Sequence, residues 1–386
     1  MAVNLIRNSR VFFTTNVDSQ GRVRAGAYKD VANPFTDSNT FEIQVLEGMS
    51  FSQNTTTDTV TLNEAGSAPA RGQRSFNTAL EPLDFSFSTY LRPFNNGTQV
   101  TAEEGYLWNA FAGSAAIGQA GAAWAAGNPA TLTLANSNKH QLQAFGLIII
   151  FDDLAYVLDN CALDTATLDF GIDAIAAIQW AGKGSLIRQL SILAGAPTAG
   201  EVPLTGTDLA GGDSAKEKNA QAKYITNKLT TLQVNDTIND FTGSDYTVPI
   251  TGGSITISNN LTYLTPANLG VVNLPITYFT GTRSVSGTLT AYLRSGASNT
   301  GGLLSGLLAN AANEIDPDYA INIQMGGGTN ATRVDLKVPA AMLQIPTVNT
   351  EQVISTTITF NGQGWSGTDF NIDSANELLV EYYATV

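Results

Sequence analysis

The sequence predicts a mainly β protein built as two tandem domains, each with one short flanking α-helix. Polar and apolar residues alternate over Gly281–Gly296 (GTRSVSGTLTAYLRSG), and a period of two is typical of a strand with one buried face. Similar motifs occur in the first half, in Gly72–Phe76 (GQRSF) and Asp84–Arg92 (DFSFSTYLR), with extra residues at about Asn77–Leu83. We interpret the repetition as one unit made twice.

Further segments match between the two halves and keep the same order along the chain. The matched pairs are Gly48–Ser52 with Gly252–Thr256, Phe145–Phe151 with Tyr319–Met325, and Cys161–Gly184 with Ala341–Gly364. The last pair runs without a gap, so Trp180 falls on Phe360 and Gly182 on Gly362. Equal alternation predicts that both copies bury the same face. The predicted core residues are Leu147, Ile149, Leu289, Ile321, Ile323 and Ile358.

Each half also has one segment with apolar residues at helical spacing, placed after the YLR motif. These segments are Ala102–Ala112 (AEEGYLWNAFA) and Leu303–Asn313 (LLSGLLANAAN). Glu103 and Glu104 lie where a helix N-terminus favours negative charge. Ala112–Ala130 is rich in Ala and Gly and has no counterpart in the second half. It is either a contact between stacked subunits or a surface insertion.

The ends of the units follow from strand and linker signals. The expected opening and closing strands are Arg10–Asn16, Phe41–Leu46, Leu229–Val234 and Glu377–Tyr383. Ser191–Lys223 contains Pro197, Pro203, several glycines and a charged run, which is typical of a linker. We therefore predict a first domain over residues 1–195, a linker over 196–222 and a second domain over 223–386.

Composition excludes some classes of function. Charged residues make up 13% of the 386 residues, against about a quarter in ordinary globular domains. Low charge with abundant Thr and Asn suits β-structure in a large assembly, where subunits bury much of the surface. The formal net charge of −14 and the lack of a Lys/Arg cluster argue against a protein that binds nucleic acid by neutralising phosphates.

Targeting and membrane signals are weak. Met1–Phe13 has Arg7 and Arg10 but no apolar run behind them, which argues against a signal peptide. The apolar run Leu147–Phe151 is too short to span a bilayer. Cys161 is the single cysteine, so no intrachain disulfide forms. We expect a soluble protein made in the cytoplasm, with no membrane partner.

The residues that carry chemistry elsewhere do not form a recognisable site here. His140, the only histidine, and Cys161 cannot build a catalytic triad or a usual zinc site between them. The match of Cys161 to Ala341 indicates a small buried position. Asp152 and Asp153 are candidates for half of a metal site or an acid/base pair. Their counterpart is a glycine run, so a turn is the simpler interpretation.

Two further patterns also favour structural interpretations. Asp159, Asp164 and Asp169 recur every five residues, which fits neither one helix face nor one strand face. Asp164 and Asp169 become polar residues in the second copy, so exposure is expected there. Gly326–Gly328 is not a phosphate loop, because Thr329-Asn330 follows instead of Lys-Ser/Thr. We predict no catalytic, cofactor-binding or metal-binding residues, no cofactor and no enzyme activity.

Taken together, GTRSVSGTLTAYLRSG, the LLSGLL helix and the late strand ending ITFNGQG resemble the major tail tube proteins of phages. Many members carry a G-x-R-S-x-S-G-x-[LF]-x-[AL]-Y strand, a short helix near a Leu-Leu pair, and a late strand that ends with an aromatic residue and Gly. The resemblance covers Gly252–Gly364. It is looser over Gly48–Gly184, where an insertion interrupts the motif at Phe76–Asp84.

The resemblance implies a β-sandwich or barrel flanked by a helix, part of which joins neighbouring subunits in a continuous β-barrel around a channel for DNA. Such tubes are usually stacked hexameric rings, and members with two fused tube domains form trimeric rings with pseudo-sixfold symmetry. The duplication places this chain among the latter. The implied partners are other copies and the tape measure, baseplate, terminator and, as a further candidate, sheath proteins.

The same resemblance implies a virion location, in the phage tail, and DNA that passes during genome ejection without tight binding. An acidic channel wall would repel phosphate, although the acidic residues equally serve solubility. Rival interpretations are a baseplate hub, a tube initiator or a secretion-tube subunit. From another class, a β-sandwich that binds carbohydrate would need an exposed aromatic platform, whereas the aromatic residues here mostly occupy alternating core positions.

Overall fold

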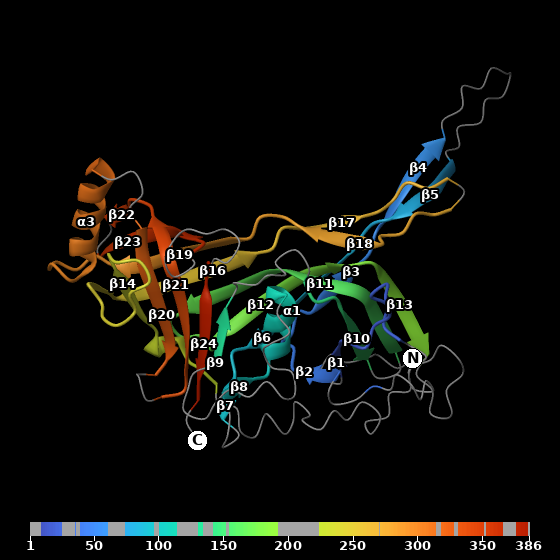
Figure 1. The fold of residues 1–386 in the computed structure, drawn as a ribbon, viewed down its shortest axis with the longest axis horizontal. Coiled ribbons are helices and arrows are strands. Elements are labelled where there is room, and N and C mark those ends of the chain that lie inside the picture. Colours follow the sequence, from blue (N-terminus) through green and yellow to red (C-terminus); the bar gives the residue numbers. More distant parts are fainter. Residues whose placement is uncertain are drawn as a thin grey trace.

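The computed structural model describes residues 9–24, 35, 39–60, 74–95, 100–113, 130–133, 142–151, 154–191, 224–269, 271–313, 318–327, 331–350, 353–365 and 376–384. Within these ranges the chain is mainly β, with antiparallel sheets and two short α-helices, which confirms the predicted fold class (Figure 1). None of the helices in these ranges is both long and apolar enough to cross a bilayer.

The first half has its first strand close to the predicted opening strand, Arg10–Asn16. Its elements are β1 (Ser9–Thr14), β2 (Thr40–Ile43), β3 (Ser50–Ser52), β4 (Thr55–Val60), β5 (Arg74–Leu80), β6 (Leu83–Tyr90), β7 (Pro93–Asn95), β8 (Val100–Ala102), α1 (Gly105–Ala112), β9 (Ala130–Thr133), β10 (Phe145–Phe151), β11 (Leu154–Gly171), β12 (Ala177–Gly184) and β13 (Leu186–Ser191).

The second half begins with a single 3₁₀ turn and ends with the predicted closing strand. Its elements are η2 (Asn227–Leu229), β14 (Thr231–Asn235), β15 (Tyr246–Val248), β16 (Ile250–Ser258), β17 (Leu261–Leu264), β18 (Thr277–Thr280), β19 (Ser284–Tyr292), α3 (Thr300–Asn313), β20 (Asp318–Gly326), β21 (Arg333–Leu343), β22 (Thr347–Thr350), β23 (Ile354–Gln363) and β24 (Leu379–Tyr383).

Each half has two sheets that share one long strand. In the first half β2, β1, β10, β11 and β13 pair in that order, and β3, β6, β12 and β11 form the other sheet. Residues 154–161 of β11 pair in one sheet and residues 162–169 pair in the other. The two sheets form two layers, and the side chains between these layers are removed from water. This arrangement explains the large number of buried apolar residues.

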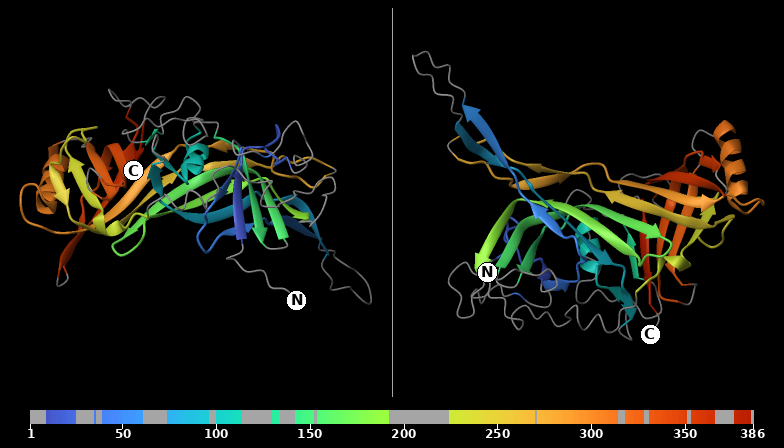
Figure 2. Two further views of the ribbon diagram at one scale, coloured as in Figure 1. Left: turned by 90° about the horizontal axis from the view of Figure 1, so that it is seen from below. Right: turned by 180° about the vertical axis from the view of Figure 1, so that it is seen from behind.

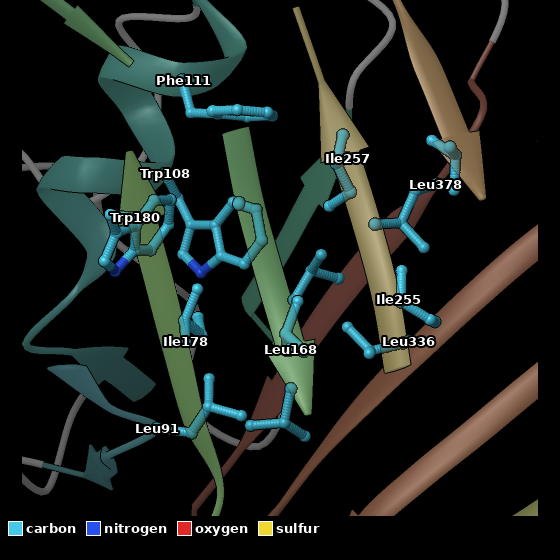
Figure 3. Close-up of a cluster of buried hydrophobic side chains, with 14 of the residues drawn as sticks. Leu91, Trp108, Phe111, Leu168, Ile178, Trp180, Ile255, Ile257, Leu336 and Leu378 are labelled. Atoms are coloured by element: carbon cyan, nitrogen blue, oxygen red, sulfur yellow. The ribbon is translucent and has the colours of Figure 1, made fainter. Parts of the chain in front are cut away.

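The apolar run Phe145–Phe151 is buried on both faces, not on one. Leu147 and Ile149 belong to the main core, as predicted, whereas Ile148 and Ile150 belong to a second cluster with Phe12. The remaining predicted core residues are also buried: Leu289, Ile321, Ile323 and Ile358. The main core is continuous between the halves, because Trp108, Trp180 and Leu168 lie near Ile255, Ile257 and Leu336 (Figure 3).

The strand pairings of the first half recur in the second half. Each pairing within the first set of strands has a counterpart within the second set. The equivalent strands are β1 and β14, β2 and β15, β10 and β20, β11 and β21, β12 and β23, β13 and β24, β3 and β16, and β6 and β19. Even the irregularities correspond, because the β10–β11 ladder shifts between Phe145 and Leu147 and the β20–β21 ladder between Tyr319 and Ile321.

The strand registers correct part of the sequence match. Phe85 lies opposite Gly182, and their counterparts Gly287 and Phe360 lie opposite each other. Gly182 therefore corresponds to Phe360, and the expected match of Gly182 to Gly362 is wrong by two residues. The cause is the turn before β12, which is longer than the turn before β23.

The GxRS match is also wrong as a structural equivalence. Arg74 begins β5 and is exposed, whereas Arg283 lies beside β19 and donates from Nε to Asn259 Oδ1 at 3.1 Å. The expected insertion Ala112–Ala130 and the linker 196–222 fall almost entirely outside the described residues.

Candidate functional site

Two candidates for chemistry, Cys161 and Asp159, are buried. Cys161 is fully buried, and burial raises the pKa of its thiol well above the ordinary value. Asp159 is also fully buried, and Arg188 donates from Nη2 to its Oδ1 at 2.7 Å. This ion pair offsets the cost of burying the carboxylate. His140, Asp152 and Asp153 lie outside the described residues.

The remaining candidates also have structural roles. Asp169 is exposed, as expected. Asp164 is partly buried instead, because it accepts the backbone N–H of Leu261 at 2.7 Å. Gly326 has a positive φ of 114° where β20 ends opposite Arg333, which supports the turn interpretation. The described residues contain no group of three or more His, Cys, Asp and Glu placed to hold a metal ion.

The feature with the strongest functional character is a polar sheet face that runs through both halves. Strand β11 pairs with β12 of its own half and with β16 of the second half, so one sheet continues as β3-β6-β12-β11-β16-β19-β23-β22. Figure 2 shows these strands crossing the molecule as one curved layer. We call its side opposite the core the polar face.

Hydroxyl side chains dominate the polar face. One row across the strands reads Ser88, Gln179, Thr167, Thr256, Ser286 and Asn361, and the next reads Tyr90, Ala177, Asp169, Ser254, Thr288 and Thr359. The pattern arises because these strands place most of their apolar residues toward the core and most of their Ser and Thr residues on the other side. Thr89 and Thr356 are exceptions, since both are buried on the core side. Thr167 and Thr256 bring their hydroxyls within 3.3 Å of each other where the halves join.

Few charges interrupt this face. Lys183 Nζ lies 2.6 Å from Asp84 Oδ1, and both belong to the polar face of paired strands β12 and β6. Asp169 and Asp164 add two more carboxylates on β11. The charge is thus three carboxylates against one ammonium group. Most of the chain's net charge of −14 therefore lies elsewhere.

The two outer edges of this eight-stranded sheet are open among the described strands. One edge is β3, which pairs only with β6, and the other is β22, which pairs only with β23. Val348 on β22 is 38% exposed and Phe51 on β3 is partly exposed. Open edges present unpaired N–H and C=O groups, which favour pairing with another strand.

The junction inside the chain shows how such edges are covered. Leu168 of β11 lies opposite Ile255 of β16, and both side chains are completely buried. Leu168 corresponds to Val348, because Thr167 and Thr347 lie opposite Gln179 and Thr357 in equivalent ladders. Ile255 corresponds to Phe51, because they lie opposite Gly287 and Phe85. Val348 and Phe51 at the outer edges are thus the counterparts of Leu168 and Ile255, which are buried at the junction.

Two hairpins, which we call the arms, extend beyond the sheets at one end of the molecule (Figure 1). The first arm is β4–β5 and the second is β17–β18. Leu80 donates its N–H to Asn273 O at 2.8 Å, which ties the arms together. The second arm exposes Leu264, Leu269, Val271, Val272, Ile276 and Phe279, and the first exposes Val60 and Phe76.

The sequence interpretation did not identify the arms or the open edges as functional surfaces. A signal for the second arm does exist, since apolar residues cluster in Leu264–Ile276 together with Pro, Gly and Asn. Such a segment is too interrupted for a core strand and too apolar for an ordinary loop. The open edges have no comparable signal, because edge status depends on which strands pair.

Comparison with known proteins gives one informative relative. The chain is 31% identical over 366 residues to the tail tube protein pb6 of Escherichia phage T5. The alignment covers 93% of this chain and 72% of the relative. No family model matches the sequence.

Proposed function

Because the chain belongs to the phage tail tube proteins, we propose that three copies close into a ring and that rings stack into the tail tube around a channel for DNA. Membership of this family makes the protein a structural component of the virion tail. The observation that carries the finer proposal is the pairing of β11 with β16, which joins the two halves and has an exposed counterpart at the outer edges.

The first step of the proposal is that the chain is two fused tube domains. We assign them to residues 1–195 and 223–386, with a linker over 196–222. Equivalent pairings of eight strands in each half support this assignment, as does the shared place of the ladder shifts. Two tube domains per chain let three chains supply the six positions of a ring.

The second step is ring closure through the open edges. If the β11–β16 pairing recurs between chains, β22 of one copy pairs antiparallel with β3 of the next. The register then follows from the junction, with Val348 opposite Phe51, Thr347 opposite Ser52 and Asn349 opposite Ser50. The contact buries the exposed apolar pair and covers both open edges. A head-to-tail contact of this kind produces a closed ring when its rotation closes.

The third step is that the polar face lines the channel. Its hydroxyl groups bind a layer of water between the protein and the DNA, and its small excess of carboxylates repels phosphate. Lys183 is the single cation among the described side chains of this face and is paired with Asp84. DNA thus passes without the Lys and Arg contacts that give tight binding. We propose that genome ejection uses this surface.

The fourth step is that the arms contact the next ring in the stack. They carry exposed apolar side chains that a lone subunit leaves in water. Both arms extend from the same end of the molecule, so a ring presents them together (Figure 1). Burial of Leu269, Val271 and Phe279 against a neighbouring ring would stabilise the stack through the hydrophobic effect.

Other tail proteins are the remaining partners in this proposal, namely the tape measure, baseplate, terminator and sheath proteins. The protein has no enzymatic role, uses no cofactor and is made in the host cytoplasm before assembly. A baseplate hub, tube initiator or secretion-tube subunit would share the ring. A carbohydrate-binding module would remain monomeric, so assembly separates that rival from the tube.

Disulfide trapping tests the ring and counts its subunits. The variant Val348→Cys/Phe51→Cys places one thiol on each open edge, and the native Cys161 is fully buried and does not interfere. Oxidised tubes should give bands of one, two and three linked chains on a denaturing gel, and none above three. A ladder that continues to six chains, or no links in assembled protein, would contradict the trimeric ring.

The control is Val348→Cys/Met49→Cys, which moves one thiol two residues along the same edge. In an antiparallel pair such a displaced partner lies roughly 7–8 Å away, too far for an unstrained disulfide. This control should stay mostly monomeric on the gel although it assembles. Equal trapping of both variants would contradict the proposed register.

A further inference from the structure

The two helices differ in how much of their surface is covered. Nearly every residue of α1 is buried, including Trp108 and Phe111. Helix α3 buries Leu303 and Leu307, but Leu308 is 51% exposed and Ala311 is exposed. The two helices occupy equivalent places in their halves, so the difference needs a physical reason.

The cover on α1 comes partly from the second half of the chain. Trp108 donates from Nε1 to Tyr382 Oη of β24 at 2.7 Å. Asn259, which follows β16, donates from Nδ2 to the carbonyl oxygen of Phe111 at 3.0 Å. Figure 3 shows Ile257 and Leu378 of the second half in the same buried cluster as Trp108 and Phe111. Helix α1 is thus closed by the neighbouring domain, not by its own domain alone.

The helix residues can be matched through what they contact. Tyr106 stacks on Phe41 of β2, with ring centroids 3.6 Å apart. Gly306 faces the hydroxyl of Tyr246 of β15, and Tyr246 is the counterpart of Phe41 in the strand register. Tyr106 therefore corresponds to Gly306. The same offset along the helix matches Glu104, Trp108 and Phe111 with Leu304, Leu308 and Ala311.

We propose that Leu304, Leu308 and Ala311 form a docking face for the first half of a second copy of this chain. The approaching element is β13, because β13 pairs with β11 as β24 pairs with β21. This inference rests on the proposed ring, in which the contact between copies repeats the contact between halves. It adds a second contact, outside the channel wall, to the edge pairing of β22 and β3.

The chemistry of the face fits this occupant. Helix α3 has no charged residue, so its burial removes no ion from water. Leu304 replaces the buried Glu104, so no carboxyl group on α3 requires a partner there. Helix α3 and strand β13 lie at opposite ends of the molecule (Figure 1). Opposite ends are what a head-to-tail contact between copies requires.

The test compares Leu308→Lys with a charge-matched control, Thr237→Lys, in the exposed loop after β14. Leu308→Lys should fold with unchanged thermal unfolding of the monomer, because the side chain is half exposed there. Its tube assembly should need a protein concentration about tenfold higher or more, since a desolvated leucine contact is lost. Thr237→Lys and the apolar Leu308→Met should assemble as the wild type does.

Two outcomes would overturn the docking face. One is normal assembly of Leu308→Lys, by electron microscopy and sedimentation, while the wild type forms rings of three. The other is equal loss of assembly in Thr237→Lys, which would show a general effect of added charge. Failure of the ring itself is recognised separately, because the disulfide ladder of Val348→Cys/Phe51→Cys would then be absent.

Discussion

A glycine and an aromatic ring exchange places between the halves. In the first half the Phe85 ring covers Gly182, and in the second half the Phe360 ring covers Gly287. A Cβ on either glycine would overlap the ring that covers it. The volume at this place in the core is therefore conserved although the residues are swapped, as close packing demands.

This exchange makes a prediction about paired substitutions. Phe360→Gly alone should cost about 3–5 kcal/mol, because it leaves a cavity, and Gly287→Phe alone should also destabilise by overpacking. The double variant Gly287→Phe/Phe360→Gly recreates the arrangement of the first half. Its loss should be clearly smaller than the sum of the single losses in a double-mutant cycle of urea unfolding. Additive losses would contradict the equivalence of β6 with β19 and of β12 with β23.

At the scale of elements, helix α1 depends on a buried acid at its first turn. Glu104 is the N-cap residue, but its side chain makes no cap hydrogen bond. It accepts the backbone N–H of Arg92 at 3.3 Å instead, and lies beside Tyr382 of β24. Burial raises the pKa of Glu104 to about 7. A helix N-terminus favours a negative charge on Glu104, as the sequence indicated, but desolvation of the carboxylate has the larger effect on its pKa.

The raised pKa predicts how stability changes with pH. The folded state holds the Glu104 proton more tightly than the unfolded state, whose ordinary pKa is 4.5. The contribution of Glu104 to the free energy of unfolding is therefore largest below pH 4.5. It falls as the pH rises to about 7 and is constant above that pH. The full loss is about 3 kcal/mol.

Glu104→Gln tests this sign. The amide keeps the shape but cannot ionise, so the variant should gain stability relative to the wild type between pH 5 and pH 8. Urea unfolding of the unassembled proteins at both pH values measures the difference. A stability difference that is the same at pH 5 and pH 8 would refute the assignment to Glu104.

For the whole molecule, the weakly charged polar face predicts how assembled tubes interact with DNA. Tubes should bind duplex DNA weakly at low salt, with little dependence on salt concentration. Thr167→Lys/Thr256→Lys adds two cations at the junction of the halves and should create binding that falls with salt. Filter binding of assembled tubes at two salt concentrations measures both proteins. Tight, steeply salt-dependent binding by the wild type would show that another, basic surface lines the channel.

The sequence by itself determined the fold class and the core residues. Alternation at Leu289, Ile321 and Ile358 was sufficient, because burial of one strand face follows from a period of two. Leu147 and Ile149 are buried as predicted, but within a continuous apolar run that is buried on both faces. The family resemblance also came from motifs within single strands, and the 31% identity to a tail tube protein bears it out.

Only the tertiary structure decided which edges stay open and which residues correspond. Val348 and Leu168 have similar side chains, yet one is exposed and the other buried, because β16 pairs with β11 and no described strand covers β22. The gapless match of Gly182 to Gly362 failed for the same kind of reason. A turn changes length at little cost, while strand register depends on partners far away in the chain, which local patterns do not encode.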